Sequence, residues 1–370
     1  MIRIMDVKLM DLESKIKKVK DALKGRKVAV GFSCGADSTA LLDIAGDSAD
    51  EVAAFTVDTG FMPPGFIENA SSIAGSLGVE HFIINRPLLE NQEFVSNTPE
   101  RCLVCKNIIY SSILSEARKR GFEAVLDGTT ASDMFEDRPG TLVNHLLGIE
   151  TPLLDAGITR SDVLEYLKKR NLEYSENTTC LATRIKDQEI TPERINRVSY
   201  AETLVRGLYG EGIVRVRHEG DSAIIEVDEP ERLLNAANLR HIENELMAVG
   251  FKRVLLDLTG YREGEDDIVL YRPCRDAESR IMFEVKLPYH IDIKETCEKL
   301  EERKPRCSEK MGVVMVEVGE SNVTIFRNGK IVARRVVDRE DAEEVLLEVL
   351  PHIIRAHEDM ESQNHSQSEA

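Results

Sequence analysis

Residues 28–42 read VAVGFSCGADSTALL, and this stretch decides the fold. The apolar run at 28–30 predicts a buried strand, the small residues SCGADS predict a turn, and a helix is expected from about Thr39. A turn between a strand and a helix N-terminus suits phosphate binding, because backbone N–H groups and the helix dipole point towards the ligand. Such a turn usually carries glycine where Cys34 stands. Cys34 is therefore either a reactive thiol or a small residue that the turn tolerates.

The chain up to about residue 170 alternates short apolar runs with helical patterns. The predicted strands lie at 51–57, 80–85 and 122–128, and the predicted helices lie at 66–78, 99–120 and 159–170. This alternation indicates an α/β fold with a parallel sheet, in which ligands bind at the carboxyl ends of the strands. We therefore expect functional residues directly after strands, at 33–38, at Asp58 and at 127–129.

The pattern changes near residues 186–192, where Thr191 is a predicted N-cap and Pro192 a predicted first helical residue. Short mixed runs of strands and helices follow, which predict small α+β domains. The predicted division is a parallel-sheet domain at 1–188, a small α+β domain for substrate binding or oligomerisation at 189–267, a further α+β domain without assigned role at 268–356 and a disordered tail at 357–370.

Composition excludes several classes of protein. The net charge of −18 over 370 residues argues against a nucleic-acid-binding protein, which needs a basic face. No apolar run approaches the roughly 20 residues needed to cross a bilayer, and the N-terminal segment has the pattern of an amphipathic helix rather than a signal peptide. The seven cysteines favour a reducing compartment, where they are thiols or metal ligands and not disulfides. We expect a cytoplasmic protein.

The turn contains no G-x-x-x-x-G-K-[ST] motif, but SCGADS resembles the PP-loop, SGGxDS, of the ATP pyrophosphatase superfamily, whose fold is adenine nucleotide alpha hydrolase-like. In such a loop Gly35 lets the backbone approach the pyrophosphate, and Ser33 and Ser38 supply hydroxyl donors. Asp37 either orients the loop or holds Mg²⁺. The alternative interpretation is an ordinary strand–turn–helix connection. Cys34 then has a simple explanation, as a small side chain turned away from the phosphates.

Three cysteines form a second group. Cys102 and Cys105, in NTPERCLVCK, lie three residues apart and so share a helix face, and Cys180 follows the last element of the same domain. A C-x-x-C pair alone is compatible with a redox disulfide, half a zinc site or two core residues. Three thiolates suit an iron–sulfur cluster with one iron left open.

Taken in order, SCGADS, NTPERCLVCK, LDGTTASDMFEDRPG, NTTCLATRI, RVRH and LLDLTGYREG resemble the LarE family of ATP-dependent sulfur transferases, over about residues 10–265. The resemblance implies ATP, Mg²⁺, a small carboxylate-bearing pyridinium mononucleotide acceptor, a sulfide source and a homo-oligomer without membrane or nucleic acid. Family members take sulfur from a sacrificed cysteine, here Cys180, or from a [4Fe–4S] cluster, here on Cys102, Cys105 and Cys180. All three cysteines are present, which favours the cluster, with sacrifice of Cys180 as the alternative.

Charged residues complete the predicted site. Arg215 and Arg217 share a strand face and suit a phosphate or carboxylate, although a solvated face paired to acidic residues is nearly as good an explanation. Three further arginines are candidates for anion binding: Arg138, Arg184 and Arg262. Asp127 and Asp133 are predicted to bind Mg²⁺ or to position the adenylate, with buried carboxylates that stabilise turns as the alternative. Gly128, next to Asp127, is a further predicted cofactor-binding residue. The catalytic candidates are Cys180, Asp37 and Lys106, the last as a partner for anionic charge, and the resemblance links Glu202 and Glu226 to a metal site.

Several features depart from the family pattern. Cys34 replaces a loop glycine, the segment TLVNHLLGIE lacks an expected basic residue, and the added third region carries Cys274, Cys297 and Cys307, which we expect to be core thiols. A tRNA thiolase, a PP-loop amidotransferase and a nucleotide-binding protein without turnover remain as rivals. The acidic composition opposes the first, no glutaminase domain accompanies the second, and the three retained cysteines count against the third.

Overall fold

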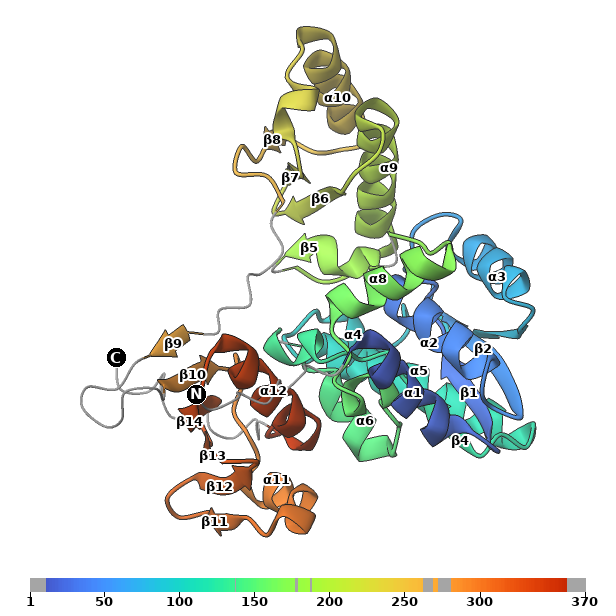
Figure 1. Cartoon of the computed structure of the whole chain (residues 1–370). Helices are drawn as coiled ribbons and strands as arrows, with labels where there is room; N and C mark the ends of the chain where they lie inside the picture. The colour runs from blue at the N-terminus through green and yellow to red at the C-terminus, as the bar shows by residue number, and fades with distance from the viewer. Residues whose placement is uncertain are drawn as a thin grey trace.

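The computed structural model describes residues 11–136, 138–176, 179–186, 188–261, 269–271 and 281–357. Its first part, which we call the N-terminal unit, is built on a parallel sheet with the order β3-β2-β1-β4 (Figure 1). The strands are β1 (Lys27–Gly31), β2 (Glu51–Asp58), β3 (Glu80–Asn85) and β4 (Ala124–Leu126). The predicted α/β fold with a parallel sheet is confirmed. Because β2 and β4 lie on opposite sides of β1, the strand order reverses at the carboxyl end of β1, which is where open α/β sheets bind ligands.

Helices cover both faces of this sheet, because alternate residues of β1 point to opposite sides. Val28 and Val30 belong to a core with α1 (Leu12–Leu23), α2 (Ala36–Gly46), α3 (Phe66–Ser76) and α8 (Arg160–Arg170). Ala29 belongs to a second core with α5 (Arg101–Lys119) and α6 (Thr141–Leu147). The remaining short elements of this unit are α4 (Gln92–Val95), η1 (Ser132–Phe135), α7 (Pro152–Asp155) and η2 (Leu181–Arg184).

A second sheet, with the order β5-β6-β7-β8, forms what we call the middle unit. Its elements are β5 (Ile185–Lys186), α9 (Pro192–Tyr209), β6 (Val214–Glu219), β7 (Ser222–Val227), η3 (Pro230–Leu233), α10 (Ala236–Ala248) and β8 (Arg253–Leu256). Thr191 caps α9 by accepting from the N–H of Arg194, and Pro192 is its first residue, as predicted. The hairpin of β6 and β7 packs with α9 and α10 around a core of its own.

A third, antiparallel sheet with the order β11-β12-β13-β14-β10-β9 forms the C-terminal unit. Its elements are β9 (Val269–Tyr271), β10 (Ile281–Lys286), α11 (Ile293–Lys299), η4 (Glu301–Arg303), β11 (Arg306–Ser308), β12 (Val313–Val318), β13 (Ser321–Phe326), β14 (Lys330–Val336), α12 (Arg339–Val349) and η5 (Leu350–His352). Gly329, in the turn before β14, has φ 87°, and a Cβ there would lie 2.4 Å from the carbonyl oxygen of Tyr289. Only glycine fits that close approach.

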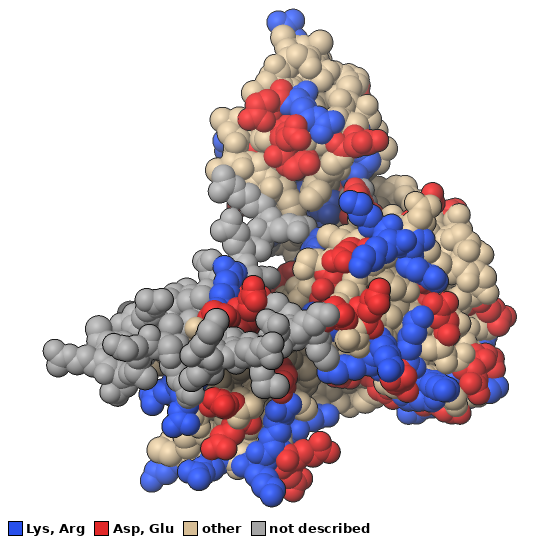
Figure 2. Space-filling view, viewed as in Figure 1, with Lys and Arg blue, Asp and Glu red and all other residues tan. Residues whose placement is uncertain are grey.

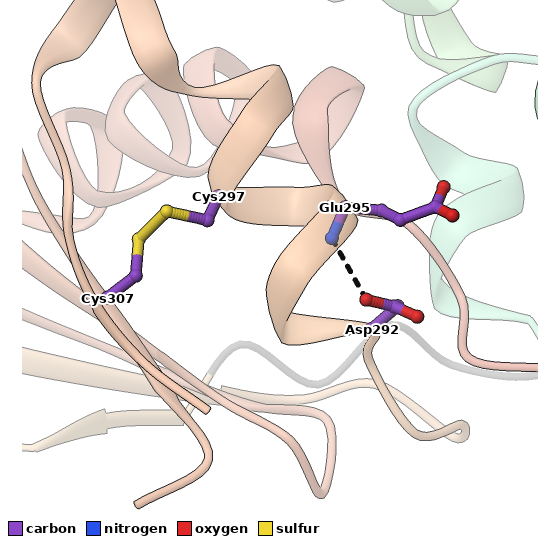
Figure 3. Close-up of a disulfide and its surroundings, with 4 residues drawn as sticks. All are labelled: Asp292, Glu295, Cys297 and Cys307. Atoms are coloured by element: carbon purple, nitrogen blue, oxygen red, sulfur yellow. Dashed lines mark hydrogen bonds between the residues drawn. A yellow bond between two sulfur atoms is a disulfide. The ribbon is translucent and has the colours of Figure 1, made fainter. Parts of the chain in front are cut away.

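One expectation about the cysteines is wrong. Cys297 and Cys307 form a disulfide (Figure 3), whereas the sequence predicted that these two are core thiols and that the cysteines in general are not in disulfides. The packing of α11 against β11 brings their Cα atoms to 6.3 Å, within the range that a disulfide spans. Spacing along the chain carried no sign of that approach. Cys274 lies outside the described residues. Among the described helices, none is long and apolar enough to cross a membrane.

Candidate active site

A cleft of about 1540 Å³ lies between the N-terminal and middle units, at the carboxyl end of β1. Sites for one drug-sized ligand usually measure about 300–1,000 Å³, so this cleft has room for two small substrates. It is lined by loop residues after β1 and β4, by the start of α5 and by residues on both sides of the β6–β7 hairpin. The predicted position of functional residues, directly after strands, matches this lining at 33–38 and at 127–129.

The loop after β1 is closed by serine hydroxyls. Ser33 Oγ lies 3.1 Å from Ser38 Oγ, and the N–H of Ser33 donates to Ser38 Oγ at 3.3 Å. Gly35 is the N-cap of α2 and offers no side chain to the first N–H groups of the helix, so an anion in the cleft can take them. Gly128, after β4, packs so closely that a Cβ there would lie 3.0 Å from the backbone nitrogen of Ser38. Glycine at 128 therefore lets the two loops meet.

Cys34 is a structural residue of this loop. Its side chain is fully buried in the core beneath α2, and the cleft lining passes from Ser33 to Gly35 without it. Burial raises the pKa of the Cys34 thiol to about 11, so it stays protonated near neutral pH. Its φ of 51° is left-handed, which is the reason why such turns usually carry glycine. The interpretation of Cys34 as a small tolerated residue agrees with this geometry.

Asp37 lies in the first turn of α2 with an uncompensated carboxylate. Its Oδ1 is buried, and no hydrogen-bond partner for it occurs among the described residues. Burial, and then the nearby charge of Asp133, raise the pKa of Asp37 to about 6, although Arg160 and Arg138 oppose the shift. Asp133 itself pairs with Arg138 at 2.5 Å. A buried carboxylate oxygen without a partner beside a cleft is the position expected for a cation or a donor brought by a ligand.

Asp127 lies at the end of β4 and is fully engaged. Lys106 Nζ lies 2.9 Å from its carboxylate, Tyr110 donates to it at 2.5 Å, and the N–H of Thr129 donates at 2.7 Å. Burial disfavours its charge, but Lys106 and these hydrogen bonds outweigh burial and lower the pKa of Asp127 to about 2. Asp127 is therefore ionised and holds the Lys106 ammonium at the cleft.

The three predicted ligand cysteines line the same cleft. Cys102 and Cys105 lie in the first turns of α5, which begins at Arg101 and not at residue 99 as predicted. Arg101 Nη1 donates to the carbonyl oxygen of Ala182 at 3.2 Å and so ties the start of α5 to the segment after Cys180. Cys105 and Cys180 also pack against one apolar cluster. These contacts bring together thiols that are 75 or more residues apart in sequence.

The thiols influence one another electrostatically. Burial, followed by the neighbouring charges of Cys180 and Cys102, raises the pKa of Cys105 to about 12. Burial also raises the pKa of Cys180, although the Ala182 backbone and two arginines oppose it. Within the described part of the chain, no three Cys, His, Asp or Glu side chains converge on a single metal ion. The ligand set of an iron–sulfur cluster differs from such a site, because each thiolate binds a different iron. Three thiols that line the same cleft fit such a ligand set.

Arg215 reaches the cleft from β6. It is 7% exposed, it lies over the Tyr261 ring with its guanidinium carbon 5.8 Å from the ring centroid, and it donates to the carbonyl oxygen of Val214. Burial, and then the charge of Arg184, lower the pKa of Arg215. Arg262 lies outside the described residues. Sequence reasoning missed four arginines that line the cleft: Arg101, Arg160, Arg206 and Arg232. Of these, only Arg101 had a signal, because it stands directly before Cys102 in the cysteine motif.

Other predicted residues lie away from the cleft lining. Arg217 pairs with Glu226 at 2.7 Å, and Arg184, only 1% exposed, pairs with Glu202 at 2.8 Å. Both glutamates that the resemblance linked to a metal therefore bind arginines here. Asp58 accepts from the N–H of Gly60 and closes a turn. In this structure these five residues stabilise the frame around the cleft.

The sequence is similar to that of an enzyme. It is 30% identical over 244 residues to the pyridinium-3,5-bisthiocarboxylic acid mononucleotide synthase of Lactiplantibacillus plantarum, and the match covers 65% of this chain and 88% of the synthase. This chain belongs to the LarE family. It is also 29% identical over 246 residues to an uncharacterised protein of Methanocaldococcus jannaschii, covering 66% of this chain and 94% of that protein.

A third relative is an uncharacterised protein of Synechocystis, which is 28% identical over 266 residues, covering 70% of this chain and 99% of that protein. No family model matches the chain. In each of the three pairs, nearly the whole relative is matched by about two thirds of this chain. In each of the three comparisons, about a third of this chain therefore has no counterpart in the relative.

Proposed function

We propose that this chain is an ATP-dependent sulfur transferase, which adenylates a carboxylate of a pyridinium mononucleotide-like acceptor and replaces oxygen with sulfur. The observation that carries the proposal is a single cleft lined both by the loop 33–38 and by the thiols of Cys102, Cys105 and Cys180. The name of the L. plantarum relative, which specifies a thiocarboxylic acid mononucleotide, supports this acceptor class. The cleft also has the volume for a nucleotide and a second substrate.

The loop residues have defined roles in the first half-reaction. The first N–H groups of α2 and the hydroxyls of Ser33 and Ser38 would bind the triphosphate of ATP. Asp37, with its buried unpartnered oxygen, would help to hold the Mg²⁺ that accompanies ATP, whereas Asp127, whose oxygens are already engaged, would keep Lys106 in place. Lys106, fixed by Asp127, would stabilise negative charge on the oxygens bound to the phosphorus under attack. The acceptor carboxylate attacks the α-phosphorus, the bond to pyrophosphate breaks, and an acyl adenylate remains.

The cysteines serve the second half-reaction. Cys102, Cys105 and Cys180 would hold a [4Fe–4S] cluster, which when bound supplies the sulfide. A sulfur nucleophile forms a bond to the activated acyl carbon and the carbon–oxygen bond to AMP breaks, which leaves a thiocarboxylate. Arg215, on the far wall of the cleft, would bind the anionic acceptor through its guanidinium. Interspersed acidic and basic side chains on the face shown in Figure 2 also favour a small acceptor over nucleic acid.

Acceptor-dependent release of pyrophosphate tests the first half-reaction. Asp37→Ala is expected to lose this release, because the variant lacks the carboxylate that compensates the bound cation. Asp21→Ala, on the exposed side of α1, is the matched control and is expected to behave as the unchanged protein. Equal release from both variants would contradict the assignment of the loop as the ATP site.

A further inference from the structure

The C-terminal unit packs directly against the N-terminal unit. Ala131, Met134 and Leu154 of the N-terminal unit belong to the same buried apolar cluster as the core of the C-terminal sheet. Leu347, on α12, packs against this cluster, and its Cβ lies 3.5 Å from the position of a Cβ at Gly157. Figure 1 shows α12 on the side of the C-terminal unit that faces the N-terminal unit. The contact is therefore a continuous core and not a loose surface approach.

The short helix η1, which contributes Met134 to this shared cluster, has two different faces. Met134 is 5% exposed and lies in the shared apolar cluster, whereas Asp133 lines the cleft. Asp133 accepts from the N–H of Thr130 at 2.7 Å and pairs with Arg138. One turn of helix thus connects the C-terminal unit with the charged residues around Asp37. Movement of Met134 moves Asp133 with it, because the two residues are adjacent.

A second contact reaches the cleft through α6. His145 Nε2 lies within hydrogen-bond distance of the carboxylate of Glu295, which projects from α11. Figure 3 shows Glu295 directed away from the disulfide, with its backbone N–H bonded to Asp292. Next to His145, Asn144 donates to Thr129 Oγ1 at 3.2 Å, and Thr129 bonds to Asp127. A chain of direct contacts therefore runs from α11 to the carboxylate that holds Lys106.

We infer that the C-terminal unit is a positioning module for the nucleotide end of the cleft, with Leu347 and Glu295 as its positioning residues. The apolar cluster that includes Met134 sets the place of Asp133 and Arg138, and the contact of Glu295 with His145 sets the place of Asn144 and Thr129. Neither positioning residue lines the cleft. The inference rests on the proposed function only in taking the ligand at this end to be ATP. It gives a role to the region for which the sequence indicated none.

The test measures the order of residues 129–146 and the affinity for ATP in separate experiments. Leu347→Ala and Glu295→Ala are compared with the conservative variants Leu347→Met and Glu295→Gln, and with the controls Met311→Ala and Glu298→Ala, which alter exposed side chains of the same unit. Hydrogen–deuterium exchange of residues 129–146 is measured in the full chain without ligand. Calorimetry with Mg²⁺ and ATP then gives the ATP dissociation constant.

Faster exchange at 129–146 is expected in both alanine variants, together with an ATP dissociation constant weakened about tenfold, which corresponds to about 1.4 kcal/mol. The conservative variants and the controls are expected to match the unchanged protein. Unchanged exchange at 129–146 in both alanine variants would overturn the inference. This holds even if the variants exchange faster in β12 and β13 of the C-terminal unit itself. If the unchanged protein binds no ATP, the proposed function fails, and the exchange data still decide whether the C-terminal unit orders this segment.

Discussion

The carboxylate of Asp37 is expected to destabilise the ligand-free protein above pH 6. Its pKa rises from the ordinary value of 3.8 to about 6, chiefly because the carboxylate, with its unpartnered Oδ1, is shielded from water. Between these values the folded state binds the proton and the unfolded state does not, so stability falls as pH rises from about 4 to about 6 and stays lowered above that. The difference of about two pKa units corresponds to at most about 3 kcal/mol.

Asp37→Asn removes the charge and keeps the shape. At pH 7.5 the variant is expected to be more stable than the unchanged protein by about 1–3 kcal/mol, which for a chain of this length corresponds to a melting temperature about 1–4 °C higher. At pH 4 the two proteins are expected to unfold alike. The assay is urea or thermal unfolding at a series of pH values, followed by circular dichroism. A variant that is less stable at pH 7.5, or a difference that does not change with pH, would refute the reasoning. Saturating Mg²⁺ and ATP are expected to stabilise only the unchanged protein.

Two further predictions concern the arginine pair on β6 and Cys34, whose roles the sequence alone left open. Arg215→Ala is expected to weaken acceptor binding about thirtyfold, because losing one partner of a charge-assisted contact costs about 2 kcal/mol. Arg217→Ala is expected to change acceptor binding little, because Arg217 pairs with Glu226 away from the cleft lining. Titration calorimetry with the acceptor separates the two, and a larger loss in Arg217→Ala would contradict this geometry. Cys34→Gly is expected to keep pyrophosphate release, because the buried thiol does not line the cleft and glycine suits the left-handed backbone. Complete loss of pyrophosphate release in a folded variant would show that the thiol takes part in the reaction.

The alternation of strands and helices was sufficient to predict the parallel sheet and the position of its ligand site. Period-two patterning placed Arg215 and Arg217 on one face, but it did not distinguish them, because the partner of Arg217 comes from β7 and the aromatic ring under Arg215 comes from residue 261. Arg184 was a reasonable candidate for anion binding until the fold placed Glu202 beside it. Such pairings depend on tertiary contacts.

The same limit applies to the C-terminal unit. Its strands were predictable from alternating apolar residues, but neither the Cys297–Cys307 disulfide nor the docking of Met134 had a signal in the sequence. Each depends on elements that approach only after folding. The meeting of Cys105 and Cys180 on one cleft wall was expected from the family resemblance, and Arg101 and its bond to Ala182 supply the physical reason for it.

Iron content and sulfur turnover, measured on one anaerobically reconstituted sample, test the central claim most directly. The account predicts about four irons per chain, repeated transfer when sulfide is supplied, and loss of both in Cys102→Ser, Cys105→Ser and Cys180→Ser. Cys274→Ala, in the same preparation, is the matched control and is expected to keep both. One transfer per chain without iron, with Cys180 lighter by the mass of hydrogen sulfide, would contradict the cluster and establish sacrifice of Cys180 in its place.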